Sequence, residues 1–496
     1  MPLDMKWFEE MEARIPKGEV RTRFAPSPTG YMHVGNLRTA LYTWCIARHA
    51  GGKFLLRIED TDQARLVEGA VDIIYKTLEE CGLDHDEGPD VGGPVGPYVQ
   101  TERRSTYLPY AKLLVERGCA YYCFCDKAES MEDSENFTRE ADPCRDLSPE
   151  EVQRRLDAGM PYVIRQKIPT EGTTTFHDEI FGDVTAPNAD LDDQVLIKRD
   201  GLPTYNFANV IDDHLMGITH VVRGSEYLSS APKYNLLYEG FGWEVPKYVH
   251  CSPVMRDAHN KMSKRHGDPS YEDLIREGYL TEAVVNYVAL LGWAPGGERE
   301  FYSIRELAEE FDMARISKSP AIFDRVKLNY FNSEYIKNLS PEAFAKAAEP
   351  WIRRSVKNPA LDAAEIAALL QQRTEVLSEI PEKLTFFDEL PEYGTELFEH
   401  KKSKSDKVSS IEMLRFILPR FEALPEWSVE AVHDCLVQGA EELECKNAKL
   451  MWPVRIAASG TAVTPGGAVE ICHILGREET LRRLKAGLEK LEKEAE

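Results

Sequence analysis

The chain has 496 residues, enough for about three domains that each bury a core. Hydrophobic residues make up 43% and charged residues 29%, as in ordinary globular proteins, and ten cysteines in so long a chain do not indicate a disulfide framework. The net charge of −24 argues against non-specific polyanion binding, although a local basic face can still bind nucleic acid. Residues 1–19 lack the apolar core of a signal peptide and residues 283–293 are too few to span a bilayer, so we expect a cytoplasmic protein without a membrane partner.

The first part of the chain alternates between strand and helix patterns. Residues 20–25 alternate as a strand does, and a turn rich in proline and glycine follows. Apolar residues then recur at helical spacing over 34–50, a second strand is predicted at 53–58, and a second helix at 67–81. This order predicts the first half of a doubly wound parallel sheet.

The pattern changes between residues 99 and 209. This stretch contains a cysteine-rich segment (119–144), a short predicted helix (148–158) and strand-like pieces at 162–168, 174–186 and 194–198. We interpret it as an α+β insertion in the sheet, because the parallel pattern resumes with a strand at 218–223 and a helix at 229–241.

Strand patterns nearly disappear after residue 270. Helices are predicted at 272–292, 303–311, 341–357, 362–378, 408–422 and 428–441, and leucines at helical spacing end the chain. The expected fold is therefore α/β: a doubly wound, Rossmann-like catalytic domain with an α+β insertion, followed by all-α C-terminal domains. We expect an N-terminal extension (1–18), the catalytic domain in two halves (19–98 and 210–245), the insertion (99–209), a domain carrying a lysine-rich loop (246–340) and a helical domain (341–496).

The turn before the first helix carries a histidine and a glycine suited to a nucleotide. His33 lies at the start of the 34–50 helix, where backbone N–H groups and the helix dipole favour phosphate. Gly35 leaves room for a flat base, and Asn36 follows. Neither the dinucleotide GxGxxG sequence nor a GxxxxGK[ST] phosphate loop occurs, so dehydrogenase and P-loop NTPase interpretations lack their defining residues.

A second motif supplies cations. Lys261, Ser263, Lys264 and Arg265 belong to the segment KMSKR, and lysines on a loop can offset charge as pyrophosphate leaves a triphosphate. A generic basic surface loop is the plain alternative. Together with His33, the segment indicates adenylation with ATP, accompanied by Mg²⁺.

These two motifs together resemble the class I aminoacyl-tRNA synthetases. Residues 23–30 (RFAPSPTG), 57–62 (RIEDTD), 203–209 (PTYNFAN), 212–217 (DDHLMG) and 223–226 (RGSE) narrow the resemblance to the bacterial-type glutamyl-tRNA synthetases. The resemblance implies a glutamate–tRNA ligase that forms glutamyl-adenylate from L-glutamate and ATP, generally with tRNA bound, and transfers the glutamyl group to tRNA(Glu). A monomer is expected. It also implies catalytic roles for His33, Lys261 and Lys264, and ATP contacts from His33, Gly35, Asn36, Glu226, Lys261, Ser263 and Lys264.

The glutamate site follows from the same resemblance. A side-chain carboxylate needs a cationic fork, which Arg23 and Arg223 can supply from neighbouring strands, while Glu59 can hold the α-ammonium group. Ser27, Tyr205 and Asn209 complete the implied pocket. A surface ion pair is the alternative role for an arginine in a predicted strand.

The helical C-terminal part separates the rival functions. A glutaminyl or archaeal-type enzyme is expected to end in β-barrels, and a truncated relative that modifies tRNA lacks an anticodon domain. A non-catalytic paralogue that binds tRNA or a regulator is a further alternative, against which the intact motifs argue. Arg373 is a candidate reader of the third anticodon base. Whether tRNA(Gln) is also charged stays open at this point.

A metal site is predicted in the insertion. Some members of the family bind zinc there through a Cys-x-Cys pair, a later cysteine and a histidine or similar ligand. Cys123, Cys125 and Cys144 match the cysteines, and either Asp146 or Cys119 would be the fourth ligand. Three reduced thiols without metal are the alternative.

Overall fold

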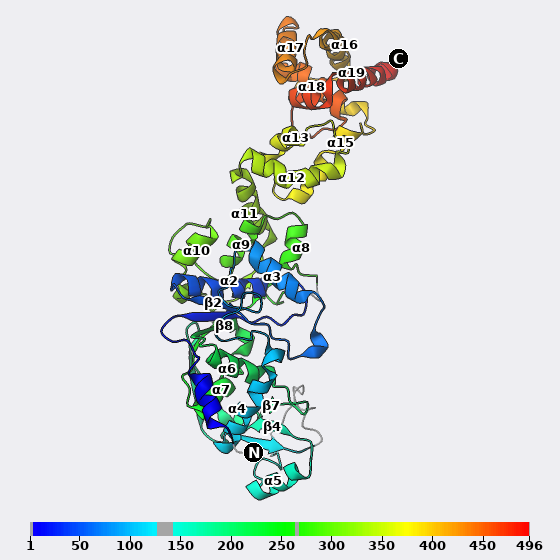
Figure 1. Cartoon of the computed structure of the whole chain (residues 1–496). Helices are drawn as coiled ribbons and strands as arrows, with labels where there is room; N and C mark the ends of the chain where they lie inside the picture. The colour runs from blue at the N-terminus through cyan, green and yellow to red at the C-terminus, as the bar shows by residue number, and fades with distance from the viewer. Residues whose placement is uncertain (1–2, 126–141, 263–266, 496) are drawn as a thin grey trace. The chain divides into compact units, whose positions relative to one another are not determined.

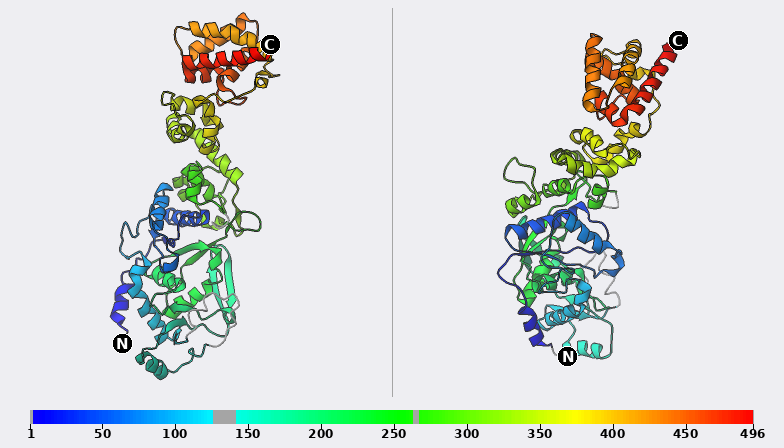
Figure 2. Two further views of the ribbon diagram at one scale, coloured as in Figure 1. Left: turned by 90° about the vertical axis from the view of Figure 1, so that its right-hand side faces the viewer. Right: turned by 45° about the horizontal axis from the view of Figure 1, so that its top comes forward.

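The structure is a computed structural model that describes residues 3–125, 142–262 and 267–495. The chain divides into two compact units: unit 1 is Met1–Ile275 with Val284–Asp324, and unit 2 is Arg276–Ala283 with Arg325–Glu496. Unit 1 contains the sheets, whereas unit 2 is built of helices (Figures 1 and 2). None of the described helices is long and apolar enough to cross a membrane.

Unit 1 is organised around a six-stranded sheet with the strand order β2-β1-β8-β9-β5-β6. Neighbouring strands are parallel except in the β5–β6 hairpin, so the predicted doubly wound fold is confirmed. Helices α2 and α3 lie on one face of the sheet, and α6 and α7 lie on the other (Figure 1). The elements are β1 (Arg21–Phe24), β2 (Lys53–Leu56), β5 (Thr173–Asp178), β6 (Gly182–Pro187), β8 (His220–Gly224), β9 (Lys247–Cys251), α2 (Val34–His49), α3 (Ala70–Glu80), α6 (Tyr205–Leu215) and α7 (Ala231–Phe241).

The remaining elements of unit 1 surround this sheet. In the insertion, β3, β4 and β7 form a small antiparallel sheet beside α5, while β10 and β11 pair separately. The bounds are α1 (Met5–Glu12), α4 (Arg104–Glu116), β3 (Ala120–Cys123), α5 (Pro149–Asp157), β4 (Val163–Gln166), β7 (Val195–Ile197), β10 (Val254–Met255), α8 (Tyr271–Arg276), α9 (Thr281–Ala289), α10 (Ile304–Glu310) and β11 (Ala321–Ile322). Along the chain, the division between the two units falls after Ile275 in α8 and after Ala283 in α9.

Three expectations about these elements need correction. The 174–186 pattern forms the β5–β6 hairpin, which pairs with β9 of the main sheet through Asp178 and Tyr248 rather than staying within the insertion. Helix α6 was not expected, because buried polar residues interrupt its apolar pattern. The predicted helix 272–292 is broken into α8 and α9 by Gly278, whose positive φ of 92° ends a helix.

Unit 2 is all-helical across its described residues and has one extended hydrophobic core. Buried residues from Ile336 to Leu491 pack together in this core. Local signals set the helix starts: Ser340 caps the N-terminus of α12, and Asp406 with Ser409 forms a capping box on α16. The helices are α11 (Arg325–Asn338), α12 (Pro341–Ser355), α13 (Ala363–Leu370), α14 (Ile380–Lys383), α15 (Thr385–Asp388), α16 (Lys407–Ala423), α17 (Val429–Glu442), α18 (Asn447–Ser459) and α19 (Ala468–Ala495).

The N-terminal extension is part of the core of unit 1. Asp4 caps α1, and the buried ring of Phe8 packs edge-on against Tyr110 of α4 with ring centroids 4.9 Å apart. The carboxylate of Glu12 lies 2.9 Å from His214 Nε2, and the ring of His214 stacks on Trp243 with centroids 3.6 Å apart. The extension therefore packs against α4 and contacts α6.

Replacing Phe8 tests this packing. Phe8→Ala removes a buried ring and is expected to destabilise unit 1 by about 3 kcal/mol. A guanidinium titration followed by tryptophan emission measures the change, because Trp7 and Trp243 both lie beside Tyr110. Lys6→Ala, at an exposed position of the same helix, should leave the unfolding midpoint unchanged. An unchanged midpoint for Phe8→Ala would show that α1 adds nothing to the core.

Candidate active site

A pocket of about 450 Å³ opens at the carboxyl edge of the main sheet in unit 1. The turns that follow β1, β2 and β8 contribute to its wall, as expected for a ligand site in a doubly wound fold. The structure brings together most of the residues predicted for the glutamate and ATP sites. Those that line the pocket are Arg23, Ser27, His33, Gly35, Asn36, Glu59, Tyr205, Arg223, Glu226 and Lys261.

Two buried arginines meet one buried aspartate at the base of this pocket. Arg23 of β1 donates from Nε and Nη2 to the two carboxylate oxygens of Asp213, at 2.8 and 3.1 Å. Arg57 contacts the same carboxylate through Nη1 at 2.8 Å. Burial raises the pKa of Asp213, but attraction to both guanidinium groups outweighs burial and leaves the pKa below its ordinary value. The expectation that Arg23 offers a free fork is thus corrected: its fork already holds Asp213.

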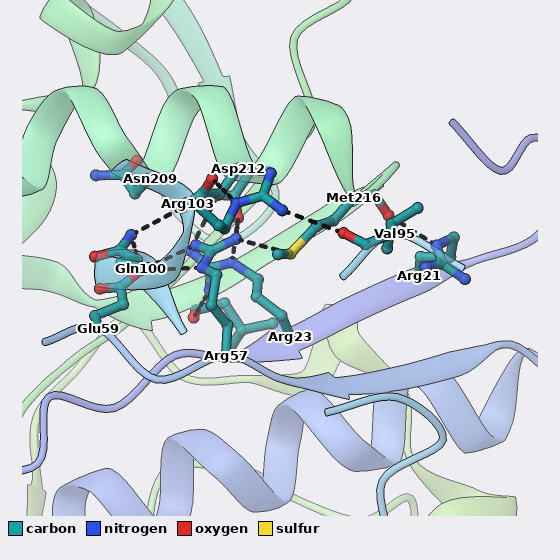
Figure 3. Close-up of polar contacts among 12 residues, drawn as sticks. Arg21, Arg23, Arg57, Glu59, Val95, Gln100, Arg103, Asn209, Asp212 and Met216 are labelled. Carbon is teal, nitrogen blue, oxygen red and sulfur yellow. Dashed lines mark hydrogen bonds and ion pairs between the residues drawn. The ribbon is translucent and has the colours of Figure 1, made fainter. Parts of the chain in front are cut away.

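Glu59 lies next to this cluster and has one carboxylate oxygen left over. Its Oε1 accepts a hydrogen bond from Arg57 Nη2 at 2.9 Å, while its buried Oε2 has no partner among the described residues. Figure 3 shows Glu59 beside Gln100 and below Asn209 of α6. Burial raises the pKa of Glu59 to about 7, against the opposing attraction of Arg57 and Arg23. A cation placed at Oε2 would stabilise the ionised carboxylate.

Arg223 is a buried cation of the pocket and, like Arg38, has no carboxylate in direct contact among the described residues; Arg38 instead donates to the backbone oxygens of Leu291 and Ser252. Arg223 Nε donates to His250 Nε2 at 3.0 Å, and its buried Nη2 has no hydrogen-bond partner among the described residues. The guanidinium lies over the rings of Tyr227, Tyr234 and Tyr248, with 5.3, 4.5 and 5.2 Å to the ring centroids. Tyrosine faces stabilise a cation without neutralising it, so the pocket offers a positive charge for an anionic ligand.

Helix α6 supplies the residues that the motif PTYNFAN predicted. Tyr205 and Asn209 are four residues apart on one face, and the amide of Asn209 donates to Tyr205 O at 2.9 Å. Tyr205 stacks on Tyr227 with centroids 5.5 Å apart and lines the pocket. Asn209 is buried beside the pocket rather than in its wall.

His33 occupies the N-terminus of α2 as predicted. It is the N-cap residue, and its Nδ1 accepts a hydrogen bond from Gly35 N at 3.0 Å. A Cβ on Gly35 would lie 3.2 Å from that nitrogen, so the glycine lets the imidazole fold over the helix start. At this end of α2 the helix dipole and the free backbone N–H groups of the first turn favour an anion, and His33, Gly35 and Asn36 line the pocket.

Lys261 reaches the pocket from a β-hairpin. The hairpin is closed by backbone hydrogen bonds from Arg256 N to Asn260 O at 2.9 Å and from Met262 N to Val254 O at 3.2 Å. The exposed Lys261 side chain lies at the pocket rim. The predicted Ser263 and Lys264, and the adjoining Arg265, lie outside the described residues.

Two residues of the cluster were present in the quoted motifs but had no predicted role. Arg57 begins RIEDTD and Asp213 is the second residue of DDHLMG. An alternating Arg-x-Glu at a strand end places both side chains on one face, which is the signal that could have indicated a buried ion pair. Arg38, Thr39 and Thr29 also line the pocket and carried no such signal.

The cysteine cluster of the insertion is assembled with a different fourth member from the one expected. Ligand atoms of Cys123, Cys125, Asp142 and Cys144 all lie within 4.8 Å of one another. Asp146 instead points outward and pairs with Lys167 at 3.1 Å, whereas Cys119 packs against Gly240. The prediction of Asp146 or Cys119 is therefore corrected to Asp142, which the sequence spacing gave no reason to prefer.

Arg373 belongs to unit 2 and is exposed. It ends the short 3₁₀ turn Gln371–Arg373, and its Nη1 donates to Pro465 O at 3.3 Å. One end of the guanidinium is thus anchored while the side chain stays accessible to solvent.

Comparison with known proteins agrees with these arrangements. The family "tRNA synthetases class I (E and Q), catalytic domain" matches residues 19–330, and "Anticodon binding domain" matches residues 343–488. The chain is 58% identical to proteins named glutamate–tRNA ligase from Clostridium novyi, over 95% of this chain and 98% of that one, and from Clostridium kluyveri, over 96% and 99%.

A solved structure supports the same assignment. The crystal structure of a glutamate tRNA ligase from Elizabethkingia meningosepticum, in complex with its amino acid, superposes with a TM-score of 0.85 at 34% identity and covers 96% of this chain and all of that chain. Since the family match spans more than half of the residues and the relatives align over nearly their full length, the chain belongs to the class I tRNA synthetases of the glutamate and glutamine (E and Q) type.

Proposed function

We propose that this chain is a glutamate–tRNA ligase that activates L-glutamate with ATP and transfers it to tRNA(Glu). The observation that carries the proposal is Arg223, a buried cation with an unpaired Nη2 in the same pocket as His33 and Lys261. A cation in a tyrosine-lined site fits a side-chain carboxylate and not a neutral amide. The relatives named glutamate–tRNA ligase support the same substrate.

The substrate would be held at both ends. Arg223 would bind the side-chain carboxylate, and the free Oε2 of Glu59 would bind the α-ammonium group. Tyr205 and Ser27 would enclose the backbone of the amino acid, Asn209 would support Tyr205 through its backbone oxygen, and Arg23, held by Asp213, would line the pocket below them. Burial raises the pKa of Glu59, and a cation beside its carboxylate favours the ionised form. The ammonium group of the substrate and the carboxylate of Glu59 would therefore stabilise each other.

The first chemical step would be attack of the α-carboxylate oxygen of glutamate on the α-phosphate of ATP. One P–O bond forms, the bond to pyrophosphate breaks, and the electron pair leaves with the pyrophosphate. No side-chain nucleophile is needed: His33, the N-terminus of α2 and Lys261 would orient the phosphates and offset their charge, with Ser263 and Lys264 proposed from the sequence alone. Mg²⁺ would come with ATP, and Glu226, Gly35 and Asn36 would contact the nucleoside.

The second step would be attack of a terminal ribose hydroxyl of tRNA on the activated carbonyl, which releases AMP. A second pocket of about 440 Å³, in the same unit, shares Tyr205 with the first. Its wall contains the cations Arg165, Lys198 and Lys233 and the carboxylates Asp62 and Asp192, of which Asp192 pairs with Lys233 at 2.8 Å. We propose that it receives the acceptor end, because phosphates there would meet those cations and bases could stack on the tyrosine. The first pocket would then hold the adenylate alone.

A structural zinc ion fits the cysteine cluster. Two thiolates bound to one tetrahedral zinc lie about 3.8 Å apart, given Zn–S bonds of about 2.3 Å. Cys125 Sγ lies 3.6 Å from Cys144 Sγ and 3.7 Å from Asp142 Oδ1, so the donors are already spaced for such an ion. Cys123, Cys125, Cys144 and Asp142 would hold it, and it would link the end of β3 to residues 142–144.

Unit 2 would read the anticodon. Residues 325–495 form no strand, which agrees with a helical anticodon domain and not with the β-barrels expected of a glutaminyl enzyme. Arg373 would hydrogen-bond an unstacked base, a role that its exposed side chain supports. Charging of tRNA(Gln) is proposed only as a second activity of the same site.

Pyrophosphate exchange tests the activity and its phosphate-side residues. Glutamate, ATP and tRNA together should give exchange, and its complete absence would favour a non-catalytic paralogue. His33→Asn keeps an N-cap side chain but removes the imidazole ring, and Lys261→Ala removes a cation at the pocket rim. Each single variant should lower the exchange rate about 100-fold without a change in melting temperature. Lys247→Ala, an exposed lysine at the opposite end of the strands, is the control and should retain the rate. Wild-type rates in both test variants would contradict the assigned roles.

The metal assignment is tested by zinc content. Protein purified without chelator should carry about one zinc per chain. Asp142→Ala should lower zinc retention under dialysis, whereas Asp146→Ala, four residues away and paired with Lys167, should not. Content well below one zinc per chain in the wild type would leave the cluster as reduced thiols.

The anticodon role is tested by tRNA kinetics. Arg373→Ala should raise KM for tRNA(Glu) about tenfold and leave KM for glutamate and ATP unchanged, because the residue lies in unit 2. Arg482→Ala, an exposed arginine paired with Glu479, is the control. Charging of purified tRNA(Glu) and tRNA(Gln), measured side by side with each variant, shows which tRNA the residue selects; identical kinetics for Arg373→Ala would refute the role.

A further inference from the structure

Arg223 is held from behind by a buried histidine and aspartate. Arg223 of β8 and His250 of β9 are direct partners in the parallel register, so their side chains lie on the same face of the sheet. His250 Nε2 lies 3.0 Å from Arg223 Nε, and His250 Nδ1 lies 2.6 Å from Asp178 Oδ2. His250 and Asp178 are both completely buried.

The hydrogen bonds fix the tautomer of His250. An arginine Nε–H can only donate, so His250 Nε2 must carry a lone pair and the ring proton must be on Nδ1. That proton is donated to Asp178, whose carboxylate also accepts hydrogen bonds from the backbone N–H groups of Ile180, Phe181 and His250. Burial lowers the pKa of His250, which agrees with a neutral ring.

Asp178 is also the residue that joins the β5–β6 hairpin to the main sheet. It ends β5 and pairs with Tyr248 of β9, whose ring lies under the Arg223 guanidinium. The same carboxylate thus fixes the hairpin turn and, through His250, the orientation of the arginine. With Nε anchored and tyrosine rings around it, the guanidinium presents Nη2 as its buried, unused donor among the described residues.

We propose that Asp178 and His250 are positioning residues that set the preference for glutamate over glutamine by holding Arg223 in one orientation. The proposal rests on the proposed role of Arg223 in binding the substrate carboxylate. A fixed fork matches the planar carboxylate, whereas the NH₂ group of a glutamine amide would face an N–H donor. An arginine free to turn would lose affinity for glutamate and lose this discrimination.

Steady-state aminoacylation at saturating ATP and tRNA tests the proposal in the full chain. Asp178→Asn offers an amide donor to His250 Nδ1, which would move the ring proton to Nε2 and set it against Arg223 Nε–H. We expect KM for glutamate to rise about 10- to 100-fold, with kcat and the KM for ATP within about threefold of wild type. The ratio of kcat/KM for glutamate to that for glutamine should fall by a similar factor.

A pair of variants at His250 gives an independent measurement. The side-chain oxygen of His250→Gln can still accept from Arg223 Nε, whereas His250→Leu has a similar volume and no acceptor. His250→Leu should therefore raise the KM for glutamate much more than His250→Gln does. This comparison tests the positioning role if Asp178→Asn does not fold. His177→Gln is the matched control, because His177 and Asp183 form a 2.7 Å pair on the same hairpin but are exposed.

The outcomes separate this inference from the proposed function. If the wild type does not charge tRNA with glutamate, or if Arg223→Ala leaves the glutamate KM unchanged, the proposed function of the site fails first. If Arg223→Ala raises that KM but His250→Leu does not change the KM or the glutamate-to-glutamine ratio, the positioning role is overturned. A lower kcat and an equal rise in the KM of every substrate, together with a lower melting temperature, would show a structural role only and would also overturn the positioning role.

Discussion

The rest of the site depends on the ion pairs that the buried carboxylate of Asp213 makes with two arginines. A charge in the protein interior is tolerated only with partners, and Asp213 has two, Arg23 and Arg57. Because the three residues come from β1, the end of β2 and α6, this one cluster fixes the distance between the sheet and the helix that carries Tyr205 and Asn209. Removing Asp213 would leave Arg23 without a carboxylate partner, and removing Arg57 would leave Glu59 without its ion pair, so the cluster restricts which substitutions the site tolerates.

The charges around Asp213 cancel, whereas Arg223 meets the nearby carboxylate of Asp178 only through His250 and has no carboxylate in direct contact among the described residues. Arg23 and Arg57 are balanced by Asp213 and Glu59, while the histidine behind Arg223 is neutral because it accepts a hydrogen bond from Nε. An amino acid with a carboxylate side chain would give Arg223 a direct anionic partner, and its ammonium group would compensate Glu59 when that carboxylate ionises. A site with this distribution selects charge at both ends of the ligand rather than shape alone.

The sequence allowed the pocket to be predicted better than its supporting contacts. His33, Glu59, Arg223 and Lys261 sit next to turns or strand ends that a parallel fold must bring to one edge, so their meeting could be predicted. Helix α6 could not, because Asn209, Asp212 and Asp213 face buried charges and so interrupt the apolar pattern that marks a helix. Asp142 was missed for a related reason: its carboxylate lies beside the three thiols in space, which residue spacing along the chain does not encode. The same holds for Asp178, whose pairing with β9 is a long-range contact.

Glutamate recognition and phosphate handling use different kinds of support. The residues proposed to choose the amino acid lie on or just after strands and on α6, and Glu59, Asn209 and Arg223 are each held by a hydrogen bond or ion pair to another residue of the fold. The groups proposed to act on ATP come from a helix N-terminus and a hairpin at the pocket rim. This division is physically reasonable: selecting one side chain among similar ones requires a geometry held within a fraction of an ångström. Triphosphate charge, in contrast, changes position as pyrophosphate leaves, so groups that stabilise it at the rim need less exact placement than the fork that reads the carboxylate.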